Sequence, residues 1–130
     1  MLIHDDTLDR TTSGSGLVCD HTFNEITNLD AGYFFYKSKS TVRVPSLNKV
    51  LEVITNKNKS INIELKPNKG FERLNVDIIV EEIKNFSLDN IFFSSFDLES
   101  CIYLKEKLPA ALCGFLNDDF SKITLKDTTD

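Results

Sequence analysis

Long apolar runs are missing from this chain of 130 residues. A helix that crosses a bilayer needs about 20 consecutive apolar residues, and no stretch approaches that length. The first residues also lack the basic segment followed by an apolar one that marks a secretory signal. With 41% hydrophobic and 27% charged residues, the composition is typical of a globular protein. We therefore expect a cytoplasmic protein with a single domain over residues 1–130.

Paired cysteines are missing as well. The chain has three cysteines, Cys19, Cys101 and Cys113, and no two of them form a CxxC motif. An odd number without that spacing argues against a disulfide framework and against a zinc knuckle. We therefore expect reduced, buried thiols.

The chain also lacks an excess of positive charge. The sequence has 15 Lys and Arg against 20 Asp and Glu, which gives a net charge of -5. Proteins that bind nucleic acid or an anionic membrane surface usually carry a basic excess, so neither partner is expected here.

Apolar segments alternate with helical patterns along the chain. Strands are predicted over residues 1–4, 61–65, 91–96 and 110–116. Helices are predicted from Pro45 and Ser46 onward, over residues 72–85 and from the capping residue Asp97 onward. Residues 5–45 are predicted to be mostly irregular, and loops of that length are usually functional. This order indicates an α/β fold with a parallel sheet whose strands are buried on both faces.

Polar residues recur where the predicted strands end. His4 ends the first strand, Glu64 and Lys66 the second, and Ser94 and Ser95 lie near the end of the third. In parallel α/β folds ligands bind at these carboxyl ends. A lone histidine is more often structural, but this position makes His4 a candidate for proton transfer near neutral pH. The serines lack a G-x-S-x-G elbow, so strand-end hydrogen bonding is the better interpretation for them.

Glu64 and Lys66 interrupt an apolar strand. Period-2 alternation places them on one face, opposite Ile63 and Leu65. A carboxylate and an ammonium on an inward face are costly to bury unless they are paired or bind something. Two interpretations remain open, a structural ion pair or a metal ligand beside an anion-binding lysine.

Five segments in order resemble motifs of the glycerophosphodiester phosphodiesterase family. The resemblance extends from residue 2 to about residue 116 and rests on the order and spacing of the segments. They are residues 4–12 (HDDTLDRTT), 29–32 (LDAG), 44–47 (VPSL), 61–66 (INIELK) and 94–96 (SSF).

This resemblance implies a partial TIM barrel with roughly half of its eight strands present. It implies hydrolysis of glycerophosphodiesters to an alcohol and glycerol 3-phosphate. It further implies that His4 is a general acid/base that protonates the leaving alcohol, that Glu64 is a metal ligand and that Lys66 steadies the phosphate. A divalent cation, Mg²⁺ or Ca²⁺, is the implied cofactor.

The family also carries an H-R-G strand and an E-x-D strand, and neither motif occurs in this chain. The first hypothesis is therefore a phosphodiesterase represented by part of its domain, with little or no activity expected from this chain alone. The alternative is a catalytically inactive half-barrel with a binding role, which as a homo-oligomer would shield its open sheet edges.

Overall fold

The structure is a computed structural model that describes residues 1–118. The chain divides into two compact units, Met1–Glu52 and Val53–Asp130, and each is described by itself. Within the described residues, no helix is long and apolar enough to cross a membrane. The predicted single domain over residues 1–130 reaches beyond the described part and stays a prediction.

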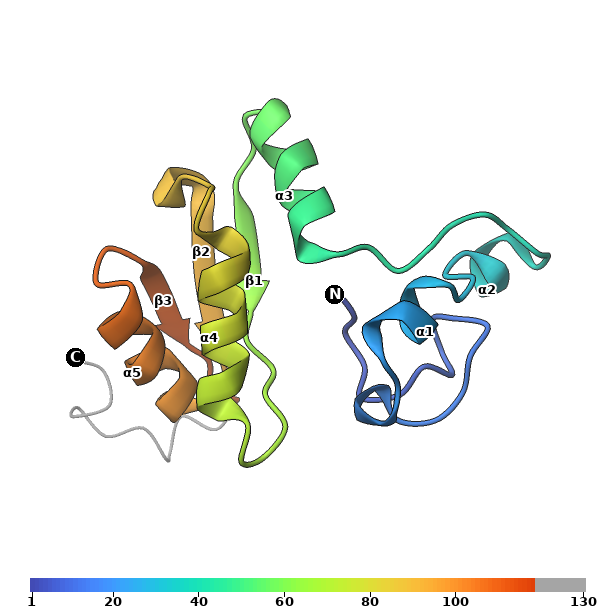
Figure 1. Cartoon of the computed structure of the whole chain (residues 1–130), viewed down its shortest axis with the longest axis horizontal. Helices are drawn as coiled ribbons and strands as arrows, with labels where there is room; N and C mark the ends of the chain where they lie inside the picture. The colour runs from blue at the N-terminus through green and yellow to red at the C-terminus, as the bar shows by residue number, and fades with distance from the viewer. Residues whose placement is uncertain (119–130) are drawn as a thin grey trace. The chain divides into compact units, whose positions relative to one another are not determined.

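The second unit is built from alternating strands and helices (Figure 1). Strands β1 (Ile61–Glu64), β2 (Ile91–Ser95) and β3 (Leu112–Phe115) form a parallel sheet in the order β1-β2-β3. Helices α4 (Glu72–Ile83) and α5 (Leu98–Lys107) connect them, with a short 3-10 helix before β2. The predicted α/β fold with a parallel sheet is confirmed.

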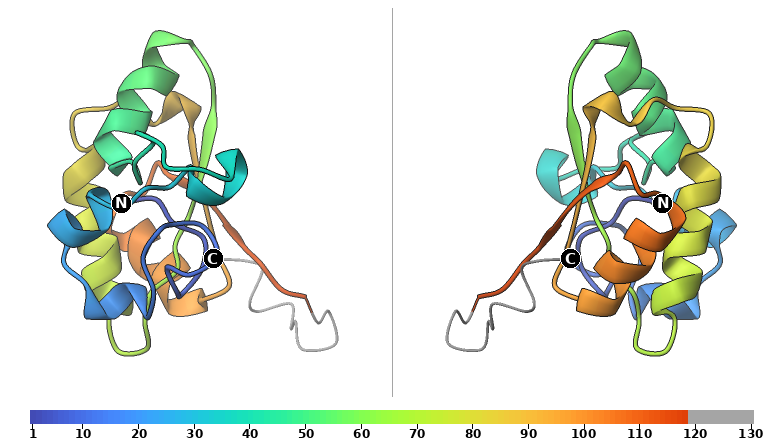
Figure 2. Two further views of the ribbon diagram at one scale, coloured as in Figure 1. Left: turned by 90° about the vertical axis from the view of Figure 1, so that its right-hand side faces the viewer. Right: turned by 90° about the vertical axis from the view of Figure 1, so that its left-hand side faces the viewer.

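Helices α4 and α5 lie side by side on one face of this sheet (Figures 1 and 2). The carboxylate of Asp97 accepts a hydrogen bond from the Ser100 amide at 2.6 Å, which confirms Asp97 as the N-cap of α5. The side chains that face the sheet include Val76 and Ile83 of α4 and Leu104 of α5, all fully buried. Removing these apolar surfaces from water is the main force that holds the helices on the sheet.

Two apolar side chains of α4 lie outside its buried face. Leu74 and Ile78 are 52% and 54% exposed, whereas Val76 is fully buried. Two residues turn an α-helix by about 200°, so Leu74 and Ile78 point away from the face that carries Val76. The buried stripe runs through Val76 and Ile83, which are two turns apart.

The expected burial of the strands on both faces is only partly observed. Phe92 of β2 and Leu112 of β3, which are register partners, are 39% and 62% exposed. Phe93, on the opposite face of β2, is buried. The helices cover one face of the sheet, so alternate side chains on the other face stay open among the described residues.

The first unit consists of a long loop with short helical turns. Its elements are η1 (Val18–Asp20), α1 (Phe23–Thr27), α2 (Tyr33–Tyr36) and the start of α3 (Leu47–Asn56), which continues into the second unit. The Ser46 hydroxyl accepts a hydrogen bond from the Lys49 amide at 3.3 Å, as expected for the residue before α3. The prediction of mostly irregular structure over residues 5–45 is confirmed.

The predicted strand over residues 1–4 is wrong, because no strand is assigned there. A strand requires a ladder of hydrogen bonds to a neighbour. Here the Leu2 amide donates to the Pro45 carbonyl at 3.0 Å, and Ile3 packs against a small core that contains Leu8. Loop packing therefore positions the residues that lead to His4.

Asp30, from the LDAG segment, organises the second half of this loop. It is 8% exposed, and its carboxylate accepts hydrogen bonds from the Gly32 amide at 2.9 Å and from the amide and hydroxyl of Ser40. The hydrogen bond from the Ser40 hydroxyl is the main reason that the pKa of Asp30 lies below its usual value. The main chain of Asp30 also binds Ser13, which connects the two halves of the loop.

We expect Asp30→Asn to destabilise the first unit in a pH-dependent way. Because folding lowers the pKa of Asp30, its stabilising contribution is complete above the usual aspartate pKa of about 3.9 and is lost as the pH falls below that value. Urea unfolding of both proteins between neutral and acid pH should show a difference that shrinks below that pKa. The exposed Asp20 provides the control, since Asp20→Asn should leave the unfolding midpoint nearly unchanged.

Candidate functional site

His4, Asp5 and Arg10 form a hydrogen-bonded cluster in the first unit. His4 Nδ1 lies 2.8 Å from Asp5 Oδ1. Arg10 donates from Nε to Asp5 Oδ2 at 2.6 Å and from Nη2 to Asp5 Oδ1 at 2.7 Å. An ionised carboxylate only accepts hydrogen bonds, so a neutral His4 carries its proton on Nδ1 in this contact. Nε2 is then the ring atom suited to exchange a proton with a ligand.

The charge of Asp5 is fixed by its partners. Hydrogen bonds from Arg10, and then from His4, hold the pKa of Asp5 well below its usual range. The same contact raises the pKa of Arg10. The side chain of His4 is 75% exposed and that of Asp5 is 21% exposed, so the imidazole is accessible while its carboxylate partner is largely covered.

Asp5 and Arg10 belong to the segment HDDTLDRTT, but neither of them was predicted to have a role. Their spacing of five residues matches neither a helix nor a strand period. The pairing depends on the path of the loop, where the Leu8 amide donates to the Gly16 carbonyl at 2.9 Å. Gly16 has a φ of 90°, a conformation that favours glycine. The sequence did contain a signal for this cluster, namely an acid beside a histidine, followed by an arginine that precedes a glycine turn.

Glu64 and Lys66 lie at the carboxyl end of β1 in the second unit. Ile63 and Leu65 are buried, Glu64 is half-buried and Lys66 is exposed, so the predicted alternation is confirmed. Glu64 is the register partner of Ser94 on β2. The carboxylate and the ammonium therefore belong to the sheet face that the helices leave open.

Ser94 and Ser95 have structural hydrogen bonds, as predicted. The Ser94 hydroxyl accepts from Asn62 Nδ2 at 2.9 Å. The Ser95 hydroxyl donates to the Leu65 carbonyl at 2.8 Å and accepts from the Asp97 amide at 3.0 Å. Ser95 is fully buried, so it joins the ends of β1 and β2 and is not placed as a nucleophile.

A complete metal site is not formed by the described residues. Within residues 1–118, no three His, Cys, Asp or Glu side chains lie together as a group that could hold an ion. Mg²⁺ and Ca²⁺ take six or more oxygen ligands, usually with more than one carboxylate, and Glu64 supplies a single carboxylate. The donor set in this part of the chain does not fit the implied cation by itself.

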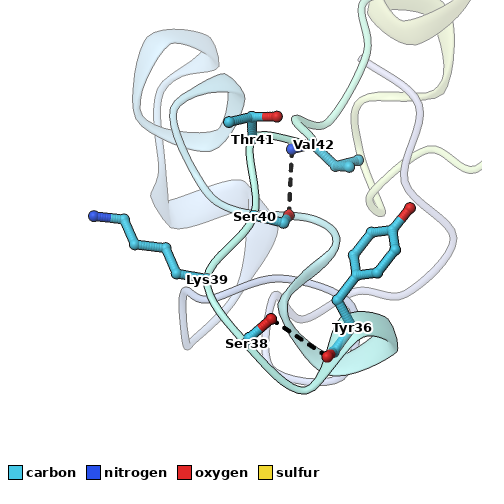
Figure 3. Close-up of a pocket in the computed structure, with 6 residues that line it drawn as sticks. All are labelled: Tyr36, Ser38, Lys39, Ser40, Thr41 and Val42. Carbon is cyan, nitrogen blue, oxygen red and sulfur yellow. Dashed lines mark hydrogen bonds between the residues drawn. The ribbon is translucent and has the colours of Figure 1, made fainter.

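A surface hollow of about 490 Å³ lies elsewhere in the first unit (Figure 3). Its lining residues are Tyr36, Ser38, Lys39, Ser40, Thr41 and Val42. The Ser40 hydroxyl accepts from the Val42 amide at 3.3 Å, and the Ser38 hydroxyl donates to the Tyr36 carbonyl at 3.4 Å. None of the predicted site residues lines this hollow, so it gives no support to the predicted site.

Comparison with known proteins gives a consistent result. The model of the glycerophosphoryl diester phosphodiesterase family matches residues 1–125. A glycerophosphodiester phosphodiesterase of Caldanaerobacter subterraneus subsp. tengcongensis is 36% identical in an alignment of length 121 that covers 89% of this chain and 48% of that protein. One from Bacillus altitudinis is 37% identical, over 83% of this chain and 45% of that protein. The chain thus spans about half the length of these relatives.

A solved structure shares the fold of this chain. It is a phosphodiesterase of Oleispira antarctica in complex with the product sn-glycerol-3-phosphate, and it matches with a TM-score of 0.81 and 33% identity. The match covers 87% of this chain and 47% of the other. The expected partial TIM barrel is confirmed by this likeness, although three parallel strands, rather than the predicted four, are formed by the described residues.

Proposed function

Since the chain belongs to the glycerophosphoryl diester phosphodiesterase family, we propose that it supplies part of a catalytic domain that hydrolyses glycerophosphodiesters to an alcohol and glycerol 3-phosphate. The observation that carries the proposal is the cluster of His4, Asp5 and Arg10, within the segment that the family model matches. The Oleispira structure, which holds sn-glycerol-3-phosphate, supports the substrate class.

His4 acts as the proton donor to the leaving alcohol in this proposal. Breaking the P–O bond leaves negative charge on the alcohol oxygen, and a proton placed there lowers the barrier. Asp5 accepts from Nδ1, so Nε2 is the atom that gives up the proton. Arg10 keeps Asp5 ionised, and the ionised carboxylate stabilises the protonated imidazole that forms before transfer.

Lys66 binds a phosphate oxygen. An ammonium acts on phosphate as a point charge, and its attraction grows as charge gathers on the oxygens during P–O cleavage. Its place on the open face at the end of β1 supports this role, because ligands of parallel α/β folds bind at that end.

Glu64 is proposed as one ligand of a divalent cation. Enzymes of this family generally depend on such a cation, which neutralises phosphate charge when it is bound. The described residues do not complete its donor set, so no step of the reaction is routed through it. We expect the remaining carboxylates to come from the part of the relatives' fold that the match to this chain does not cover.

The incomplete donor set favours a second candidate function. A chain with Lys66 and a single carboxylate ligand would bind glycerophosphodiesters or glycerol 3-phosphate without cleaving them. This binding role and the catalytic role make opposite predictions for a completed barrel.

Two experiments separate these functions. The chain alone is incubated with glycerophosphocholine and Mg²⁺ or Ca²⁺, and little or no glycerol 3-phosphate should be released. In a chimera, residues 1–118 then replace the matching segment of the Caldanaerobacter enzyme, and this protein should release glycerol 3-phosphate. A chimera that folds, as shown by its circular dichroism, but remains inactive would favour the binding role.

Asp5 is a positioning residue, and Asp5→Asn should lower kcat of the chimera by about ten-fold or more. The amide removes the negative charge that orients and stabilises a protonated His4. KM should change little, because Asp5 orients the proton donor and is not proposed to contact the substrate. A rise in KM with kcat unchanged would assign Asp5 a purely structural role.

A further inference from the structure

Cys101 and Cys113 belong to two elements that pack together in the second unit. Cys101 lies on α5 and Cys113 on β3, and the two elements are in contact. The Cys101 side chain is buried, and its Sγ lies 4.0 Å from the carbonyl oxygens of both Ser95 and Gly114. Gly114 is the residue after Cys113, so the Cys101 sulfur is held beside the strand that carries the second thiol.

The surroundings make the two thiols unequal. Hydrogen bonding with Cys101, and then the charge of Lys105, lowers the pKa of Cys113. The same hydrogen bonding, together with burial, raises the pKa of Cys101. Lys105 is anchored, because Nζ donates to the Pro109 carbonyl at 2.7 Å and to the Ala111 carbonyl at 2.9 Å. A fixed cation beside a half-buried cysteine is the environment that favours a reactive thiolate.

We propose that Cys113 and Cys101 form a redox-active dithiol that a peroxide oxidises to an intramolecular disulfide between β3 and α5. This chemistry does not depend on phosphodiester hydrolysis. Cys113 is the attacking sulfur, and Cys101 is the resolving sulfur.

The reaction balances in two steps. The Cys113 thiolate attacks one peroxide oxygen, the O–O bond breaks, and the departing oxygen takes a proton, which leaves a sulfenic acid on Cys113. The Cys101 sulfur then attacks the sulfenic sulfur, an S–S bond forms, the S–O bond breaks, and the hydroxyl leaves as water with the proton of the Cys101 thiol. The two sulfurs lose two electrons in total, and the peroxide gains them.

The test uses the full chain, reduced and then treated with a modest excess of hydrogen peroxide at neutral pH. Trypsin separates the two cysteines, because Lys105 and Lys107 lie between them. We expect mass spectrometry to find the Cys101 and Cys113 peptides joined, with the mass of two hydrogens lost. Thiol titration should fall from three groups to the single group of Cys19, and the chain should remain a monomer on a non-reducing gel.

Three variants give the controls. Cys19→Ser, which removes the exposed thiol, should form the disulfide at an unchanged rate. Cys113→Ser should slow oxidation of Cys101 by at least about ten-fold, because a buried thiol reacts poorly. Cys101→Ser should stop at the sulfenic acid, which dimedone traps. If one of these variants fails to fold, the peptide map of the unmodified chain still tests whether Cys101 and Cys113 become joined. Disulfides to Cys19, disulfides between chains, or three thiols that survive the treatment would overturn the proposal.

Discussion

Replacing His4 by alanine in the chimera should lower kcat by about 10²–10⁴-fold, the usual contribution of a general acid or base. The loss should fall mainly on kcat, because a proton donor to the leaving alcohol acts in the transition state and adds little to substrate binding. The measurement is the steady-state release of glycerol 3-phosphate from glycerophosphocholine. A substrate with a more acidic leaving alcohol, such as a nitrophenyl ester, should recover much of the lost rate, since it departs without a proton.

The second histidine of the chain supplies the matched control. His21 Nε2 is within hydrogen-bond distance of the Ser15 carbonyl, 3.2 Å away, and His21 has no proposed catalytic role. His21→Ala should therefore leave kcat within a few-fold of the unmodified chimera. Equal losses in the two variants, or an active His4→Ala chimera, would refute the proton-transfer role of His4.

Replacing Lys66 by methionine should lower kcat/KM of the chimera by about 10²–10³-fold, comparable to the removal of one group that stabilises developing negative charge. Methionine keeps most of the length of the side chain and removes its charge. KM should rise and kcat should fall, because phosphate is charged in the substrate and gathers further charge as the bond breaks. The dependence of KM on salt should weaken at the same time, because an attraction between charges has been removed.

Lys69, three residues further along the chain, allows a comparison at the same net charge. It lies in the turn before α4 and is exposed. Lys69→Met should change kcat/KM by only a few-fold, since a distant exposed charge is largely screened. If the two lysine variants lose activity equally, the effect comes from net charge, and Lys66 has no specific contact with phosphate.

Several features of the second unit could be predicted from residues that are close together in the sequence. Alternation along β1 and the Asp97 cap depend on residues near each other in the chain, so the sequence alone was sufficient for them. The strand predicted over residues 1–4 failed, because a strand is defined by a neighbour that the segment itself does not specify. The exposure of Leu74 and Ile78 could not be predicted for a related reason, since the side of α4 that faces the sheet depends on tertiary packing.

For the candidate site as well, only some features could be predicted from the sequence. His4, Glu64 and Lys66 could be selected because each is a polar residue at the end of an apolar segment. The partnership of Asp5 with Arg10 could not be derived from spacing, because it depends on how a loop without a regular period folds back. Roles for His4, Glu64 and Lys66 stay predictions, and the variants above test those of His4 and Lys66.

The sheet order β1-β2-β3 has a consequence for how the second unit folds. Each strand pairs with the next one along the chain, so Ile61 meets Ile91 and Phe92 meets Leu112 without any intervening strand. Each pairing encloses only one α-helix and its loops, so it costs less loop-closure entropy than a pairing between strands further apart in the chain would. The unit can therefore grow during synthesis, with the pair of β1 and β2 formed while α5 and β3 are still emerging from the ribosome.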